Sequence, residues 1–204
     1  MEDNIEVLLQ DHTPRFKNTR HLTMAAGAVF TGGYGMWVMF ALPGFLRVPI
    51  RLKVPFMPSP KNQTQNVLKL LKGRRGQLAD LGSGDGRLVL GAYSMGFQCT
   101  GFEINPMLLA YSRARAWWRG IPNTHIRFLN QDFWKTDMSK YQNVTVFLAP
   151  AVMEQLEQKL RAELPPNARV IVCSYPFPSW LPSCVQGAGL EQVWAYDMPP
   201  RSSE

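Results

Sequence analysis

Cysteine and histidine are scarce in this sequence of 204 residues. The three cysteines, Cys99, Cys173 and Cys184, are odd in number and form no CxxC pair, and the three histidines stand in no arrangement typical of a metal site or a nucleophile. This pattern argues against a disulfide scaffold and against a zinc centre. We therefore expect a protein of a reducing compartment that binds no metal.

Blocks of like charge are also absent. The formal net charge is +7, from 22 lysines and arginines against 15 acidic residues, and these residues are spread along the chain. A concentrated basic tail would favour nucleic-acid binding, and its absence gives no reason to expect a nucleic-acid partner. The length suits one catalytic domain of ordinary size with an additional arm or anchor.

One segment lacks charge altogether, from Leu22 to Leu42. A helix of this length would span about 30 Å, enough to cross a bilayer. Basic residues lie on both sides of it, so positive charge does not decide its orientation. A buried or interfacial helix is the alternative. The acidic start, "MEDNIEVLLQDH", fits neither a secretory signal nor an Arg-rich presequence.

Proline marks the next segment, "PGFLRVPIRLKVPFMPSP", which predicts an extended connector. We divide the chain accordingly into an N-terminal arm at 1–21, a transmembrane anchor at 22–42, a Pro-rich connector at 43–60 and a catalytic domain at 61–200.

Helical and β-branched segments alternate through the catalytic domain. Helices are predicted at 66–72, 87–95, 106–118 and 151–164, and strands at 76–81, 97–104, 124–130, 143–149 and 168–174. The stretch 184–196 reads as an antiparallel hairpin that completes the sheet. This order predicts an α/β fold with a doubly wound, largely parallel sheet. Trp117 and Trp118, near the end of one predicted helix, are expected in the core.

The stretch "LADLGSGDGR" contains a glycine loop that follows a predicted strand and opens a predicted helix. Its glycines are spaced G-x-G-x-G, unlike the G-x-G-x-x-G of dinucleotide-binding loops. It also carries Asp80 and Asp85, whose carboxylates would repel a phosphate. A ligand with an ammonium and a sulfonium would be attracted instead, which favours S-adenosylmethionine. The alternative is a glycine turn without a ligand.

Further candidates follow the next three predicted strands. Glu103 comes 23 residues after the first acid of the loop, where a second strand presents a carboxylate to a ribose. Asp132 could accept from the adenine amino group while Phe133 packs on the ring, although Asp132 also suits a helix N-cap. Ala149 and Pro150 would line the transfer site, although Pro150 equally suits the first position of a helix.

Several motifs together resemble a known family. The segments "GFLRVPIRLKVPF", "DLGSGDGR", "GFEINP", "YSRARAWWRG", "NVTVFLAP", "ELPPNARV" and "VWAYD" look like the small mitochondrial membrane-anchored lysine methyltransferases. One enzyme of this pair modifies the adenine nucleotide translocase and the other modifies the c-subunit of ATP synthase. "FLAP", "ELPP" and "PGFLRVPIRL" look more like the translocase enzyme.

The resemblance implies a Rossmann-like, seven-strand class I S-adenosylmethionine-dependent methyltransferase with an N-terminal transmembrane helix. It implies a single-pass protein of the mitochondrial inner membrane, with its catalytic domain facing the matrix, that methylates a lysine of the translocase. The cofactor residues carried over by matched position, together with the adjacent serine and phenylalanine, are Asp80, Gly82, Ser83, Gly84, Asp85, Gly86, Glu103, Asp132 and Phe133.

Other functions remain open at this stage. They are methylation of the ATP synthase c-subunit, methylation of a nucleic acid or of a small molecule such as a quinone, and a non-catalytic role in membrane assembly. Enzymes that methylate base amino groups usually end the fourth strand with an Asn/Asp-Pro-Pro-aromatic run, which "LAPA" lacks. The sequence identifies no general base.

Overall fold

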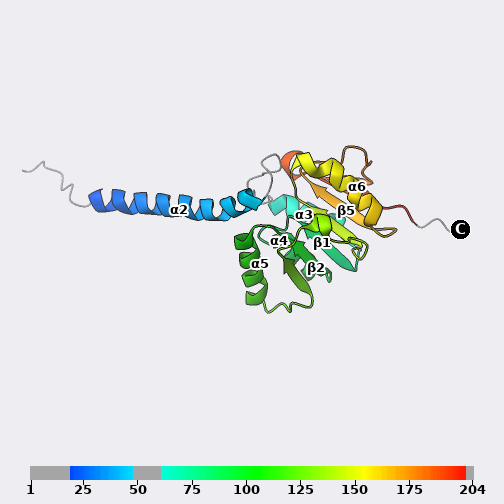
Figure 1. The fold of residues 1–204 in the computed structure, drawn as a ribbon, viewed down its shortest axis with the longest axis horizontal. Helices are drawn as coiled ribbons and strands as arrows, with labels where there is room; N and C mark the ends of the chain where they lie inside the picture. Colours follow the sequence, from blue (N-terminus) through cyan, green and yellow to red (C-terminus); the bar gives the residue numbers. More distant parts are fainter. Residues whose placement is uncertain (1–18, 48–60, 201–204) are drawn as a thin grey trace, which may run out of the picture. The chain divides into compact units, whose positions relative to one another are not determined.

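The computed structural model describes residues 19–47 and 61–200 (Figure 1). The chain divides into two compact units, Met1–Met39 and Phe40–Glu204.

A single helix, α2 (Thr19–Arg47), contains the whole predicted anchor. Its 29 residues extend over about 44 Å. Every side chain from Thr23 to Trp37 is exposed, including the large rings of Phe30 and Tyr34. The helix continues through Pro43, so the first five residues of the predicted connector are helical. The rest of that connector, 48–60, and most of the predicted arm lie outside the described residues.

Across the described part of the chain, no helix is both long enough and apolar enough to qualify as a membrane span.

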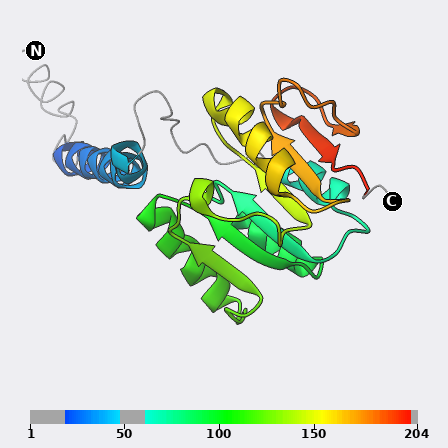
Figure 2. The ribbon, with the colours of Figure 1, turned by 45° about the vertical axis from the view of Figure 1, so that its right-hand side comes forward.

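The second unit contains one seven-stranded sheet, as the sequence predicts. Its strands are β1 (Gln77–Leu81), β2 (Gln98–Phe102), β3 (Ile126–Leu129), β4 (Asn143–Val146), β5 (Arg169–Cys173), β6 (Cys184–Gln186) and β7 (Val193–Asp197). Their order across the sheet is β3-β2-β1-β4-β5-β7-β6. The first five are parallel, and β7 runs antiparallel to both β5 and β6. Figure 2 shows the twist of this sheet.

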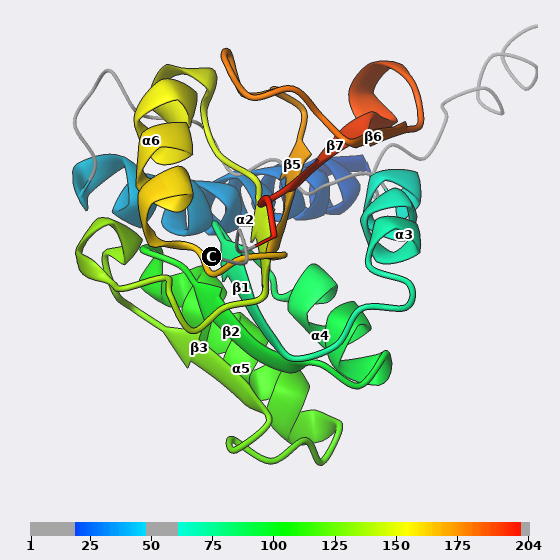
Figure 3. The same cartoon turned by 90° about the vertical axis from the view of Figure 1, so that its right-hand side faces the viewer.

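Helices cover both faces of the sheet (Figure 3). They are α3 (Lys61–Leu70), α4 (Arg87–Ser94), α5 (Pro106–Trp118) and α6 (Met153–Glu163), with short 3-10 turns η2 (Phe133–Lys135), η3 (Pro150–Val152) and η4 (Gly189–Glu191). One core joins α3, α4 and α5 to the sheet and includes Val67, Val89 and Leu109. The other joins α6 to the opposite face and includes Leu156 and Leu160. The predicted doubly wound α/β fold is confirmed.

The prediction that Trp117 and Trp118 lie in the core is wrong. The two residues are 76% and 86% exposed, respectively. The buried face of α5 consists of Leu108, Leu109, Ser112 and Ala116. At about 100° per residue, both tryptophans lie more than about 120° from the centre of that face. The buried face of α5 therefore ends at Ala116 and does not include the last two residues of the helix.

Candidate cofactor and methyl-transfer site

The glycine loop between β1 and α4 needs all three of its glycines. Gly82, Gly84 and Gly86 have φ values of 83°, 51° and 73°, in the left-handed region that other residues rarely adopt. A Cβ on Gly82 would lie 2.5 Å from the carbonyl oxygen of Phe147. The G-x-G-x-G spacing thus places glycine at each left-handed position and lets the loop approach the end of β4.

The end of β2 holds this loop in place. The backbone N–H groups of Gly82 and Ser83 both donate to the carbonyl oxygen of Phe102, at 3.0 Å each. One carboxylate oxygen of Glu103 accepts from the N–H of Gly84 at 2.9 Å, and the other accepts from the N–H of Asn105 at 2.8 Å. Each carboxylate oxygen has a further lone pair, so Glu103 can still accept from two ribose hydroxyls.

Burial dominates the electrostatics of Glu103 and Asp80. Asp80 is 4% exposed, and its Oδ1 accepts a hydrogen bond from the Thr145 hydroxyl at 2.7 Å. Burial raises the pKa of Asp80 to about 7, the Thr145 bond opposes this rise, and the charges of Glu103 and Asp85 add to it. Burial also raises the pKa of Glu103 above its ordinary value, against the backbone N–H groups that it accepts. A cation beside these carboxylates would favour their ionised forms.

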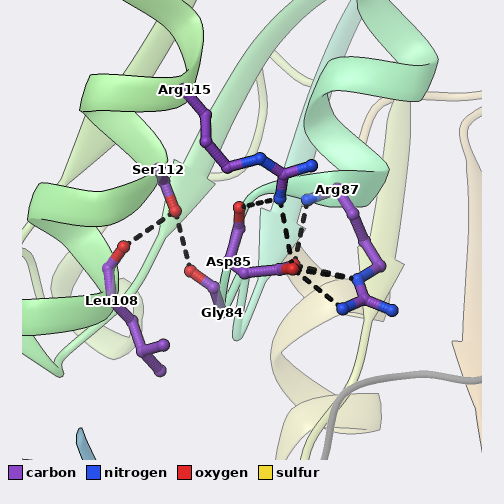
Figure 4. Close-up of polar contacts among 6 residues, drawn as sticks. All are labelled: Gly84, Asp85, Arg87, Leu108, Ser112 and Arg115. Carbon is purple, nitrogen blue, oxygen red and sulfur yellow. Dashed lines mark hydrogen bonds and ion pairs between the residues drawn. The ribbon is translucent and has the colours of Figure 1, made fainter.

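Asp85 is in a different environment, because two arginines neutralise it (Figure 4). Its carboxylate pairs with Arg87 at 2.8 Å and with Arg115 at 3.1 Å. Burial alone would raise the pKa of Asp85, but the hydrogen bonds and charge of Arg87, helped by Arg115, outweigh it and hold that pKa below its usual range. The same contacts occupy two guanidinium groups that could otherwise bind a phosphate.

Helix α5 holds the loop from the other side (Figure 4). The Ser112 hydroxyl oxygen lies 2.8 Å from the Gly84 carbonyl oxygen and 2.9 Å from that of Leu108, so its proton serves both. Arg115 Nη1 donates to the backbone carbonyl of Asp85 at 2.8 Å. Two successive carbonyl groups of the loop are therefore fixed by side chains one turn apart on α5.

The loop fits S-adenosylmethionine better than a phosphate ligand. Within the described residues, the Ser83 hydroxyl is buried and has no hydrogen-bond partner, a condition that a bound polar ligand would relieve. Asp80 and Glu103 have no basic side chain as an ion-pair partner among the described residues. Uncompensated carboxylates beside glycine N–H groups match a ligand that has hydroxyl groups and positive charge and no phosphate.

Asp132 and Phe133 lie where β3 gives way to η2. Asp132 is exposed and caps η2 by accepting from the N–H of Trp134 at 3.0 Å. The ring of Phe133 is half-buried and packs on Trp134, with their centroids 4.9 Å apart. The N-cap alternative is therefore realised, and the adenine contacts stay a prediction.

Ala149 and Pro150 follow β4, beside the glycine loop. Ala149 is buried and is the N-cap of η3, and Pro150 is the first residue of that turn. The helix-start explanation for Pro150 is thus confirmed, while its role in lining the transfer site stays a prediction. The described residues include no group of three or more metal-type side chains placed to hold an ion.

Sequence reasoning missed three contributors to the site: Thr145, Ser112 and Arg115. Thr145 lies in the middle of β4, opposite Asp80 in the register, and only strand pairing shows that they meet. Ser112 is a polar residue on the apolar face of α5, and this break in the pattern is the one signal that could have found it.

Comparison with known families gives two matches along the chain. A family model described as the ANTKMT methyltransferase domain matches residues 80–184, and one described as the ANTKMT N-terminal domain matches residues 17–49. The first begins at the acid of the glycine loop, and the second contains the charge-free run of α2.

Curated relatives cover most of the chain. The chain is 42% identical to the adenine nucleotide translocase lysine N-methyltransferase of Mus musculus, over 97% of its own length and 86% of that protein. It is 44% identical to the ATP synthase c-subunit lysine N-methyltransferase of Homo sapiens, over 86% of its own length and 73% of that protein. A protein-lysine N-methyltransferase of Saccharolobus islandicus is 30% identical over 63% of the chain and 81% of that protein.

Solved structures share the fold. An RNA methyltransferase of Salinibacter ruber in complex with S-adenosyl-L-homocysteine matches with a TM-score of 0.65 and 29% identity, over 72% of this chain and 97% of that one. A ribosomal protein L11 methylase of Lactobacillus delbrueckii matches with a TM-score of 0.57 and 15% identity, over 67% of this chain and 77% of that one.

The contacts of Asp85 predict a loss of cofactor affinity when they are removed. Asp85→Asn and Arg115→Gln should each weaken S-adenosylmethionine binding about 5- to 30-fold, because a charge-assisted contact contributes about 1–2 kcal/mol to holding the loop. The double variant should lose less affinity than the sum of the two single losses, since both variants remove the Asp85–Arg115 ion pair, while Asp85 also pairs with Arg87 and Arg115 also donates to the Asp85 carbonyl. Isothermal titration calorimetry measures all three. Arg119→Gln is the control, because this arginine follows α5 and is exposed. Wild-type affinity in folded Asp85→Asn would contradict the assignment.

The pKa of Asp80 predicts a pH dependence of cofactor binding. Because this pKa is higher in the folded than in the unfolded chain, Asp80 favours folding most at low pH, and its contribution is lost as the pH rises through about 7. A cationic ligand has the opposite preference and binds the ionised carboxylate. Affinity for S-adenosylmethionine should therefore rise between about pH 6 and 7.5, below the range where an amino group of the ligand loses its own proton.

Calorimetry on Asp80→Asn provides the control for this titration. The variant should bind weakly and with little dependence on pH, because it has no carboxyl group to ionise at that position. Equal pH dependence in the two proteins would assign the titration to another group.

Proposed function

The chain belongs to the ANTKMT methyltransferase family and is an S-adenosylmethionine-dependent methyltransferase, and from this premise we propose that it methylates a lysine of the adenine nucleotide translocase. The observation that carries the cofactor side of this function is the pair of buried carboxylates, Asp80 and Glu103, beside a glycine loop whose two nearby arginines are occupied by Asp85.

Support for the translocase as substrate comes from coverage rather than from identity. The mouse translocase enzyme and the human c-subunit enzyme differ by only two percentage points in identity to this chain. The match to the translocase enzyme extends over 97% of the chain, whereas the match to the c-subunit enzyme extends over 86%. The ATP synthase c-subunit is the second candidate.

The residues of the site have distinct tasks in methyl transfer. When bound, S-adenosylmethionine supplies a methyl group on a positively charged sulfur. Asp80 and Glu103 would hold the positive and hydroxyl groups of the cofactor. A polar group of the cofactor would be the hydrogen-bond partner of the buried Ser83 hydroxyl. Ala149 and Pro150 would border the path of the incoming lysine. That lysine must arrive neutral, which its ordinary pKa of about 10.4 opposes and an apolar, cation-bearing site favours.

Orientation is the main contribution that this architecture can make to the reaction rate. The glycine loop is bonded to β2 through Phe102 and Glu103 and to α5 through Ser112 and Arg115. Such a rigid support positions the reacting groups without reorganisation during the transfer, and proximity of this kind can supply a large part of the acceleration.

A tether in the mitochondrial inner membrane is the second part of the proposal. It rests on the charge-free run Leu22–Leu42 and on the exposure of its apolar side chains in α2. The catalytic domain would face the matrix. Confinement near a membrane-embedded substrate raises the encounter frequency and leaves the chemistry unchanged.

The substrate proposal is tested with purified translocase and purified c-subunit in detergent. Incubation with labelled S-adenosylmethionine should place the label on a lysine of the translocase, located by mass spectrometry, and leave the c-subunit unlabelled. Glu103→Gln is the negative control, because it keeps the shape of the side chain and removes its charge. Preferential labelling of the c-subunit would assign the chain to the second candidate, and label in neither would contradict a substrate of this class.

The tether predicts the behaviour of a chain that begins at Val48. This truncated protein should fold and bind S-adenosylmethionine normally, because the sheet and the glycine loop lie downstream. It should be released from mitochondrial membranes by alkaline extraction, which the full chain should resist. With excess solubilised translocase it should recover most of the activity. Release of the full chain by alkali would contradict the tether, as would loss of cofactor binding on truncation.

A further inference from the structure

The segment that runs through α5 to the edge strand β3 is unusual in charge. From Ile104 to Gln131 the chain contains no aspartate or glutamate. It contains four arginines over the same stretch, Arg113, Arg115, Arg119 and Arg127. Two of these have internal partners: Arg113 donates to the carbonyl oxygen of Phe128, and Arg115 to Asp85. Arg119 and Arg127 are exposed. Arg127 lies on β3 between Ile126 and Phe128, which pack in the core on the α5 side, so its side chain faces the other side of the sheet.

Two large aromatic side chains lie at the end of α5, next to Arg119. Trp117 and Trp118 expose 76% and 86% of their area, respectively. Exposed apolar groups of this size, side by side at a helix end, are rare on proteins that meet only water. Together with Arg119 they form what we call the α5–β3 surface, at the start of the connection from α5 to β3.

We propose that the α5–β3 surface docks on an anionic lipid bilayer. Tryptophan is the side chain best suited to the bilayer interface, because its ring is apolar and its indole N–H remains hydrated. The exposed Arg119 is attracted to anionic headgroups, and none of the 28 residues from Ile104 to Gln131 is acidic, so this stretch adds no opposing repulsion. The proposal rests on the membrane location proposed above and adds to it a contact made by the catalytic domain.

This docking has a geometric consequence for the active site. Helix α5 begins beside the glycine loop, where Asn105 caps it, and ends at Trp118. Its 13 residues extend over about 20 Å. Contact through the far end of α5 would keep the cofactor site up to about that distance from the lipid. The site would then meet a substrate lysine on a segment outside the bilayer.

The test places a fluorescent probe beside the tryptophans of the full chain. Among the described residues the free thiols are Cys99, Cys173 and Cys184, and only Cys184 is exposed. Asn123→Cys in a Cys184→Ser background therefore puts an environment-sensitive nitrobenzoxadiazole label at the α5–β3 surface. The native Cys184, labelled in the otherwise unchanged chain, is the control, because β6 is the opposite edge of the sheet.

Reconstitution compares vesicles of phosphatidylcholine alone with vesicles that also contain phosphatidylglycerol. The label at position 123 should brighten on anionic vesicles and be quenched by brominated lipid, and the label on Cys184 should do neither. Trp117→Ser with Trp118→Ser should abolish the change. Arg119→Gln should weaken it about fivefold at low salt. Arg127→Gln should leave it nearly unchanged, because that side chain faces the other side of the sheet. Leu181→Ser, at a residue that is 86% exposed, is the matched control and should have no effect.

The outcomes separate docking from the tether. If α2 is the tether, the double tryptophan variant still floats with vesicles and loses only the probe signal. If α2 is no tether, flotation itself falls with the tryptophans. An unchanged signal in the double variant overturns the proposal. So does a response at both probes, or a response to single-stranded RNA and not to lipid.

Discussion

The carboxylate of Glu103 joins the segments that make the cofactor site, and the geometry of that site depends on it. One oxygen accepts from Gly84 in the glycine loop, and the other accepts from Asn105 at the start of α5. Both hydrogen bonds are buried, so either N–H group would be costly to leave unpaired. Glu103 therefore holds the loop, the end of β2 and the start of α5 together.

The acidic residues of the site differ in whether they have a cationic partner. Asp85 has two arginines and a pKa below its usual range, so its charge serves the structure of the loop. Asp80 and Glu103 have hydrogen bonds but no cationic partner within residues 19–47 and 61–200, and burial raises the pKa of each. A cationic ligand can stabilise the ionised forms of two such carboxylates. This asymmetry distinguishes the loop from a phosphate-binding loop of similar glycine content.

Much of the fold was predictable because local patterns and topology agree. Alternating strands and helices, with a glycine loop after the first strand, predicted the doubly wound sheet and the place of Asp80 and Glu103. The partners of these acids were not predictable, because Thr145 and Ser112 meet the site only through strand pairing and helix packing. Asp85 was expected to serve the ligand, and nothing in the sequence indicated that Arg115, thirty residues later, would neutralise it.

Helix α5 shows why apolar spacing alone misled at Trp117 and Trp118. Its buried face contains Leu108 and Leu109, which pack in the core, and Ser112, which bonds to the glycine loop. Ser112 and Arg115 must face the glycine loop, and this sets the rotation of the helix about its axis. With that rotation set, the periodicity of 3.6 residues per turn directs both tryptophans away from the core. A single orientation of α5 thus explains two features. Ser112 and Arg115 contact the cofactor loop, and Trp117 and Trp118 are exposed.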